Sequence, residues 1–220
     1  RAMAPGGPAY QAVLDAFGNL AFSIDDMRIL DLIRPWYVFR HRRWFKEAKM
    51  VVMDTNLTPR TIESVLKIAE HYGVPVALNA VSVSLAPRAK AFLSRLTLLA
   101  ANIHETQAIV GQAIRDDWDA LAAAQELVSA GVRIAIVTLA ENGLCYATSQ
   151  ESGYIAAIPC DVVDDTGAGA ASMAAILYGL VNDMPVGEAM RLGVSAATLT
   201  LKSVETVRKD LSLDLLYDQL

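Results

Sequence analysis

From residue 50 onward, short apolar runs alternate with longer segments of helical periodicity, and this alternation constrains the fold more than any other feature of the chain. Apolar runs at 50–54, 74–78, 96–100 and 132–138 predict strands, and the first of them, MVVMD, is typical of a strand buried on both faces. Helices are expected between them, at 58–72, 87–94, 102–110 and 117–130. Strands that alternate with helices in this way predict a mostly parallel sheet with helices on both faces.

The ends of the chain depart from this rhythm. Two short runs, 10–15 and 20–24, flank a Gly-Asn turn and predict a hairpin, and helical patterns follow over 26–48 with a break at Pro35. Near the other end, 144–147 and 154–156 predict a paired edge, before helices at 169–180, 186–201 and 211–220. We therefore divide the chain into a lid-like hairpin with its connection, residues 1–30, and one α/β domain, residues 31–220.

The strongest local signal is the sequence Asp-Asp-Thr-Gly-Ala-Gly-Ala-Ala at 164–171. Small residues let the backbone turn sharply and aim several N–H groups at one point, and the helix that follows adds its positive end. Such a turn suits phosphate, although a Gly-rich turn without a ligand has the same composition. The dinucleotide fingerprint GxGxxG does not fit, because Ser172 replaces its third Gly, and the pattern GxxxxGK[ST] is absent from the chain.

This turn resembles the signature of the PfkB/ribokinase family, which reads Asp, two variable residues, Gly, Ala, Gly, Asp. Positions 164–169 match its first six residues. The resemblance implies that Gly167, Ala168 and Gly169 stabilise charge on a transferred phosphoryl group. The final Asp of the signature takes a proton from the acceptor hydroxyl, and Ala170 stands in its place, so that this role is empty here.

Further stretches are similar to the same family. Asn102 and Glu105 match its Asn-x-x-Glu element, which implies Mg²⁺ nearby, although Asn and Glu at this spacing also form a capping box. The family's nucleotide-contacting element Thr-x-Gly-x-x-Gly is matched by Thr138, Ala140 and Gly143. The resemblance implies that two residues of the signature, Asp164 and Thr166, contact the nucleotide as well. Ala140 replaces the first Gly of that element. Residues 25–30, 54–57, 81–84 and 87–88 resemble pseudouridine kinases in particular, and Asn79 and Ala80 depart from them.

The resemblance implies a ribokinase-like three-layer sandwich with a small β lid, and ATP and Mg²⁺ as cofactors. By the same resemblance we expect this chain to lack the family's N-terminal section, which comes before the lid. It implies phosphate transfer to a sugar or nucleoside hydroxyl, with pseudouridine as the best guess and with activity impaired at Ala170. The alternative is a degenerate member that binds a nucleotide or nucleoside, or serves as an oligomer subunit, without chemistry. An unpaired lid edge would favour a homodimer formed through the hairpin.

Composition narrows the partners. The chain of 220 residues has a formal net charge of −5 and is 54% hydrophobic, as expected of one globular core. The densest basic spot, 40–43, is flanked by aromatic residues and is compatible with nucleic acid, but the helical spacing of those aromatics favours an amphipathic helix with extended arginines. Cys145 and Cys160 lack metal or disulfide spacing. We therefore expect a cytoplasmic protein with a small-molecule partner and no nucleic acid or membrane.

Overall fold

The computed structural model describes residues 9–14 and 20–220, and its strands form two separate sheets. A small antiparallel sheet contains β1 and β2, and a six-stranded sheet has the order β3-β4-β5-β6-β7-β8. β3 to β6 are parallel, whereas β7 and β8 run antiparallel to their neighbours. The strand bounds are β1 Ala9–Leu14, β2 Leu20–Asp26, β3 Val51–Asp54, β4 Val76–Asn79, β5 Leu98–Asn102, β6 Ile134–Thr138, β7 Gly143–Thr148 and β8 Ser152–Ala156.

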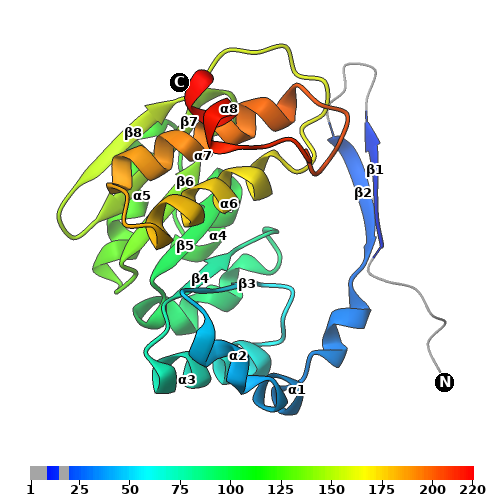
Figure 1. Ribbon diagram of the computed structural model, residues 1–220, viewed down its shortest axis with the longest axis vertical. Coiled ribbons are helices and arrows are strands. Elements are labelled where there is room, and N and C mark those ends of the chain that lie inside the picture. The colour runs from blue at the N-terminus through cyan, green and yellow to red at the C-terminus, as the bar shows by residue number, and fades with distance from the viewer. Residues whose placement is uncertain (1–8, 15–19) are drawn as a thin grey trace.

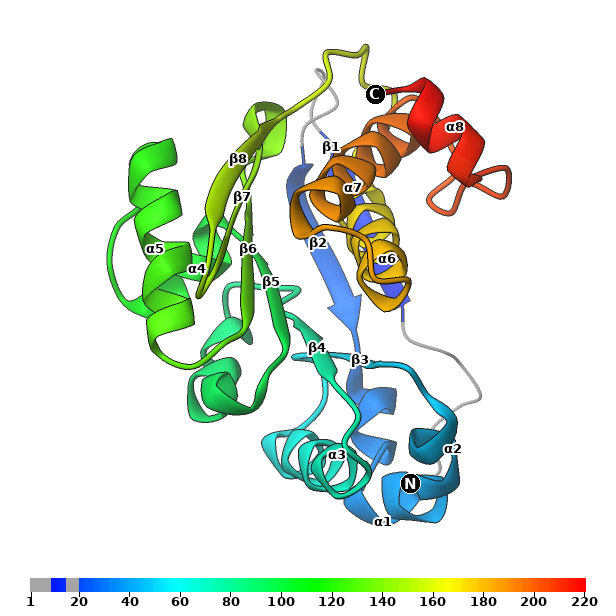
Figure 2. The ribbon, with the colours of Figure 1, turned by 60° about the vertical axis from the view of Figure 1, so that its left-hand side comes forward.

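Helices cover both faces of the large sheet, which gives the three layers that the alternation predicts (Figures 1 and 2). Among the described residues, 3₁₀ helices lie in the connections at Arg28–Leu32, Ala86–Arg95 and Ala140–Asn142. The one at Ala86–Arg95 replaces the α-helix expected at 87–94. The α-helices are α1 Pro35–Arg40, α2 Arg42–Glu47, α3 Pro59–Tyr72, α4 Ile103–Val110, α5 Asp117–Ser129, α6 Ala168–Val181, α7 Val186–Leu201 and α8 Leu213–Asp218.

Alternate residues of the strands feed two cores, one on each side of the sheet. On one side, residues such as Leu78, Leu99 and Val137 pack with α3, α4 and α5. On the other side, their neighbours Ala77, Leu98 and Ile136 pack with α6 and α7. Because successive strand side chains point to opposite faces, a continuous apolar run is what a sheet covered on both sides requires.

The expectation that β3 is buried on both faces is wrong. Met53 lies in the core beside α3, but Val52 on the opposite face is 55% exposed. β3 is an edge strand of the six-stranded sheet and pairs only with β4 among the described residues, and the core under α6 and α7 does not include Val52. An apolar run alone does not reveal which strand stands at an edge.

The hairpin expected at the start of the chain is confirmed, and its two strands form a sheet of their own, whereas the division of the chain at residue 30 stays a prediction. β1 and β2 pair from Ala9 with Asp26 to Leu14 with Leu20. Figure 1 shows this ribbon standing beside the body, and the 3₁₀ helix Arg28–Leu32 and α1 lead from it to the sheet. Pro35 is the first residue of α1, as the sequence predicts. A homodimer formed through this hairpin stays a prediction.

Local signals at the ends of α3 are confirmed as well. The side chain of Thr58 accepts a hydrogen bond from the Thr61 N–H, and Pro59 occupies the first helical position. Gly73 ends the helix with φ 69°, a conformation that suits a residue without Cβ. These contacts fix where α3 begins, and they therefore constrain the short loop that joins α3 to the carboxyl end of β3.

Candidate active site

The polar residues that follow the parallel strands lie next to one another because of the strand register. Asp54 at the end of β3 is the partner of Asn79 at the end of β4, and Asn102 of β5 is the partner of Thr138 of β6. In an open α/β sheet, ligands bind outside the carboxyl ends of the strands. The register places Asp54, Asn79, Asn102 and Thr138 at this one edge of the sheet.

Asn102 and Glu105 form the capping box that the sequence left open as an alternative. The Asn102 side chain accepts from the Glu105 N–H at 2.8 Å, and the Glu105 carboxylate accepts from the Asn102 N–H at 2.9 Å. Glu105 is only 6% exposed, and burial raises its pKa above the usual range for a carboxyl group. The pair begins α4, and one oxygen atom of Glu105 has no hydrogen bond to a described residue.

The turn from β6 to β7 carries the second group of candidate residues. Leu139 N–H donates to the Gly143 carbonyl at 2.8 Å, which closes the turn around the 3₁₀ helix Ala140–Asn142. Ala140 has φ 50°, in the left-handed region that a residue with a Cβ avoids. The position therefore has the backbone conformation of a glycine, although an alanine occupies it.

The turn before α6 is held by its own first residue. The carboxylate of Asp164 accepts from the Thr166 N–H at 2.8 Å, and this hydrogen bond keeps the pKa of Asp164 below its usual range. Gly167 follows with φ 92° and caps α6 without any side-chain hydrogen bond. The N–H groups of Gly169 and Ala170 lie in the first turn, where no intrahelical carbonyl reaches them, and no described residue accepts from them.

The two glycines of this turn face different surroundings. A Cβ on Gly167 would lie well inside 3.0 Å of the Thr206 carbonyl oxygen, so the segment after α7 passes directly against this residue. A Cβ on Gly169 would meet nothing within 4 Å. Gly169 and Ala170 are exposed. The N–H groups in the first turn of α6 therefore belong to exposed residues and have no acceptor among the described residues, which is what an anion site at a helix start requires.

The sequence reading missed the contact with Thr206 and a second feature, a clamp made by Arg88. Its Nη1 donates to the carbonyl oxygens of Thr55, Asn56 and Leu57 at 2.8, 3.3 and 3.1 Å. The clamp ties the loop after β3 to the helix after β4, at the same sheet edge as the candidate residues. Arg88 entered the sequence analysis only through a resemblance, and no local pattern indicates three carbonyl partners more than thirty residues away.

The donor set fits phosphate better than it fits a protein-bound metal. Within 9–14 and 20–220, no three His, Cys, Asp or Glu side chains gather closely enough to hold a metal ion. Mg²⁺ commonly takes one or two carboxylates and completes its shell with water and substrate phosphates. The free carboxylate oxygen of Glu105 fits that arrangement, with the uncapped N–H groups of Gly169 and Ala170 left for phosphate oxygens.

The chain is thus an α/β protein with a mostly parallel sheet and with a helix, α6, whose first-turn N–H groups lack an acceptor among the described residues. A family model described as pfkB family carbohydrate kinase matches residues 8–211. Since this covers most of the chain, the protein belongs to the pfkB family. The resemblance drawn from residues 164–169 is thereby confirmed, as is the ribokinase-like fold.

Individual relatives agree with this assignment. The pseudouridine kinase of Escherichia coli is 28% identical over 206 residues, which are 93% of this chain and 65% of that protein. The guanosine-inosine kinase of Exiguobacterium acetylicum is 25% identical over 196 residues, 88% of this chain and 65% of that protein. A solved carbohydrate kinase from Agrobacterium tumefaciens superimposes with a TM-score of 0.78 at 27% identity, covering 96% of this chain and 67% of that structure. This chain thus spans slightly less than two thirds of the two curated relatives.

Proposed function

We propose that this protein is an ATP-dependent phosphotransferase that acts on a hydroxyl group of a sugar or nucleoside. The observation that carries the proposal is the start of α6, where the N–H groups of the exposed residues Gly169 and Ala170 have no acceptor among the described residues. Donors fixed in this way stabilise charge that develops during phosphoryl transfer without having to reorganise. The membership of the pfkB family supports the same reaction class.

The other candidate residues receive roles consistent with their positions. Thr138, Ala140 and Gly143 form the turn after β6, beside Asn102 in register, and we assign them to the nucleotide. Asp164 and Thr166 hold the shape of the phosphate turn. When bound, Mg²⁺ would neutralise phosphate charge, and Glu105 is the residue suited to hold it, through one oxygen atom or through water. These roles are proposals that follow from position and donor chemistry.

Ala170 leaves the site without a group that accepts the acceptor proton. It is exposed in the first turn of α6, where a carboxylate would face the same space as the free N–H groups. A general base contributes about 10²–10⁴-fold, or roughly 3–5 kcal/mol of barrier. Phosphoryl transfer depends mostly on positioning and electrostatics, so we expect slow turnover rather than none.

Pseudouridine is the acceptor that we favour among sugars and nucleosides. Two of the curated relatives act on nucleosides according to their names, and the pseudouridine kinase is one of them. The resemblance to pseudouridine kinases includes the segments 54–57 and 81–84. These segments lie at the carboxyl ends of β3 and β4, on the same edge of the sheet as the candidate site. Arg88 holds the backbone of the first of these segments through three carbonyl oxygens.

A second function is favoured by Ala140. Its left-handed backbone stores strain at a position where a glycine would have none, and Ala170 removes the base from the same family pattern. Two alanines at two turns are consistent with a member that binds a nucleotide or nucleoside without chemistry. In that case nucleotide binding would persist while transfer is absent.

The test is phosphate transfer from Mg·ATP to a panel of nucleosides and sugars, followed by mass spectrometry of the products. Nucleotide binding is measured beside it by calorimetry. Slow formation of a nucleoside monophosphate, pseudouridine phosphate above all, supports the kinase. Binding of Mg·ATP with no product from any acceptor supports the non-catalytic member, and the absence of both binding and transfer contradicts the assignment of the α6 turn.

A further inference from the structure

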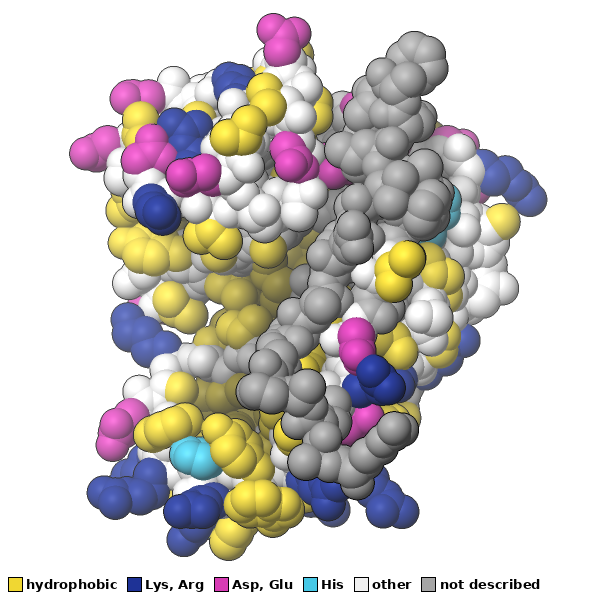
Figure 3. Space-filling model, turned by 90° about the vertical axis from the view of Figure 1, so that its right-hand side faces the viewer, with side chains coloured by type: hydrophobic (Ala, Val, Ile, Leu, Met, Phe, Trp, Pro, Cys, Tyr) yellow, Lys and Arg dark blue, Asp and Glu magenta, His cyan; other side chains and the backbone are white. Residues whose placement is uncertain are grey.

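An aromatic and basic surface on α1 and α2 has no role in the proposed chemistry. Residues 34–49 contain six Lys or Arg and only one acidic residue, Glu47, whereas the whole chain has 24 acidic and 19 basic residues. Figure 3 shows hydrophobic side chains among Lys and Arg at the lower end of the molecule, the end that α1, α2 and α3 form in Figure 1. We call this the aromatic–basic face; its members are Trp36, Tyr37, Phe39 and Trp44 with Arg34, Arg40, Arg42 and Arg43.

The aromatic side chains of this face are not part of the core. Trp36, Phe39 and Trp44 are 58%, 56% and 66% exposed, and Val38 is the one buried residue of α1. The amphipathic helix expected from the sequence is therefore only partly right, because Phe45 packs against the core whereas Trp36, Phe39 and Trp44 are exposed. Clustered exposed aromatic side chains are unusual on a surface without a partner and mark interaction sites.

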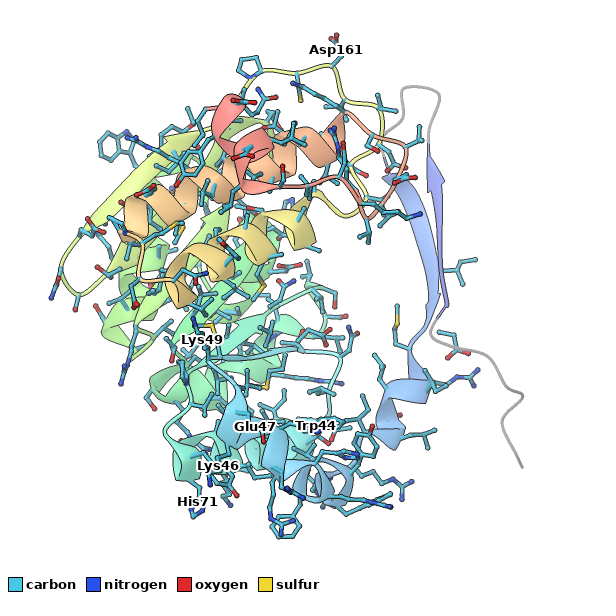
Figure 4. All side chains as sticks on the ribbon, viewed as in Figure 1. Trp44, Lys46, Glu47, Lys49, His71 and Asp161 are labelled. Carbon is cyan, nitrogen blue, oxygen red and sulfur yellow. The ribbon has the colours of Figure 1, made fainter. Side chains whose placement is uncertain are left out.

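The rings are held in place before any partner arrives. The ring of Tyr37 lies 4.4 Å from that of His41, which lies 4.5 Å from that of Trp44, measured between centroids. Arg42 lies 4.3 Å over the ring of Phe39 and donates to the Phe39 carbonyl at 3.0 Å. Figure 4 labels Trp44, Lys46 and His71 at this end of the molecule. Side chains that are already ordered lose less entropy on binding.

Two shallow hollows flank α1, and each is lined by apolar side chains together with at least one Arg or Lys. The first, of about 400 Å³, is lined by residues that include Phe39, Arg42 and Lys67. The second, of about 630 Å³, is lined by residues that include Leu32, Arg34 and Trp36. Among the described residues, no carboxylate forms an ion pair with an arginine of this face.

These features distinguish between the kinds of partner. Concave hollows accept protruding apolar side chains, which a protein segment has and a lipid surface lacks. The rings of Tyr37, His41 and Trp44 turn toward one another, whereas single-stranded nucleic acid needs ring faces free for successive bases. A symmetric contact with a second copy would bring like charges together. We propose that the aromatic–basic face binds an acidic amphipathic protein segment, with apolar side chains in the two hollows and carboxylates on the arginines.

The test uses the full chain and a displayed library of random peptides about four helical turns, or roughly 15 residues, long. Enriched peptides are synthesised, and their affinity is measured against Trp44→Ala and Arg43→Glu. Trp118→Ala and Arg133→Glu are the matched controls, because Trp118 is 80% exposed on α5 and Arg133 is exposed in the loop before β6. Thermal unfolding checks that all four variants remain folded.

We expect enriched peptides to carry acidic residues and apolar anchors at helical spacing. Trp44→Ala should lower their affinity for the chain at least roughly 30-fold, as at other interface hot spots. Arg43→Glu should lower the affinity of the peptides as well, and more strongly at low salt than at high salt. The two control variants should bind the peptides as tightly as the unmodified chain does. Failure to enrich such peptides, or equal loss in Trp44→Ala and Trp118→Ala, overturns the proposal. So does tighter binding of single-stranded oligonucleotides or anionic vesicles. Phosphate transfer plays no part in this test.

Discussion

Alanine substitution at the two glycines of the α6 turn should change stability in opposite directions. At Gly167 the φ of 92° lies in the region that L-residues avoid, and entering it costs about 1–2 kcal/mol. The new Cβ would also overlap the Thr206 carbonyl, and overpacking of this kind typically costs about 1–3 kcal/mol. Gly167→Ala is therefore expected to lower the free energy of unfolding by roughly 2–5 kcal/mol.

Gly169→Ala is the matched substitution two residues later. Its Cβ would meet nothing within 4 Å, and the position is helical, so that alanine should raise the free energy of unfolding by about 0.5–1 kcal/mol. Urea unfolding followed by circular dichroism measures both variants on one scale. If Gly167→Ala unfolds at the same urea concentration as the unmodified chain, the packing of the segment after α7 against the turn is wrong.

Three further predictions concern the same edge of the sheet. Ala140→Gly should raise the free energy of unfolding by about 1 kcal/mol, because it removes the strain of a left-handed alanine; a lower melting temperature would refute this. Asp164→Asn should be less stable than the unmodified chain at neutral pH. Because the pKa of Asp164 is lowered in the folded state, that difference should shrink as pH falls below the ordinary carboxyl range, and a constant difference in urea unfolding would contradict it. Arg88→Ala should lower the free energy of unfolding by about 1.5–3 kcal/mol, because three carbonyl oxygens lose a charged hydrogen-bond donor. Calorimetry measures this loss, with Lys90→Ala as the control at an exposed neighbouring position.

Much of the fold follows from local signals in the sequence. Pro35, Thr58 and Gly73 each mark a helix end for a reason that holds within a few residues, and each lies where the sequence predicts. The alternation from residue 50 predicts the parallel strands because buried strands and amphipathic helices have different periods. The spacing of Asn102 and Glu105 indicates either a capping box or a Mg²⁺-binding element, and the capping box is present in the structure.

What the sequence could not predict depends on residues far apart in the chain. Val52 is exposed because β3 stands at the edge of the sheet, and strand order is a property of the whole fold. Gly167 meets Thr206 through the return of the chain after α7, and Arg88 meets Thr55 across two strands. The family pattern indicates that alanine replaces another residue at 140 and at 170. The backbone strain at Ala140 follows only from its positive φ in the structure.

The measurement that tests the account most directly compares phosphate transfer by the unmodified chain, Ala170→Asp and Ala174→Asp. Both alanines are exposed on α6, and Ala174 lies one turn beyond the free N–H groups, so that Ala174→Asp is the matched control for added charge. The account predicts that Ala170→Asp gains about a hundredfold in turnover, within the range of a general base, and that Ala174→Asp gains nothing. Equal rates for all three chains, with Mg·ATP bound, would contradict the assignment of Ala170 as the missing base.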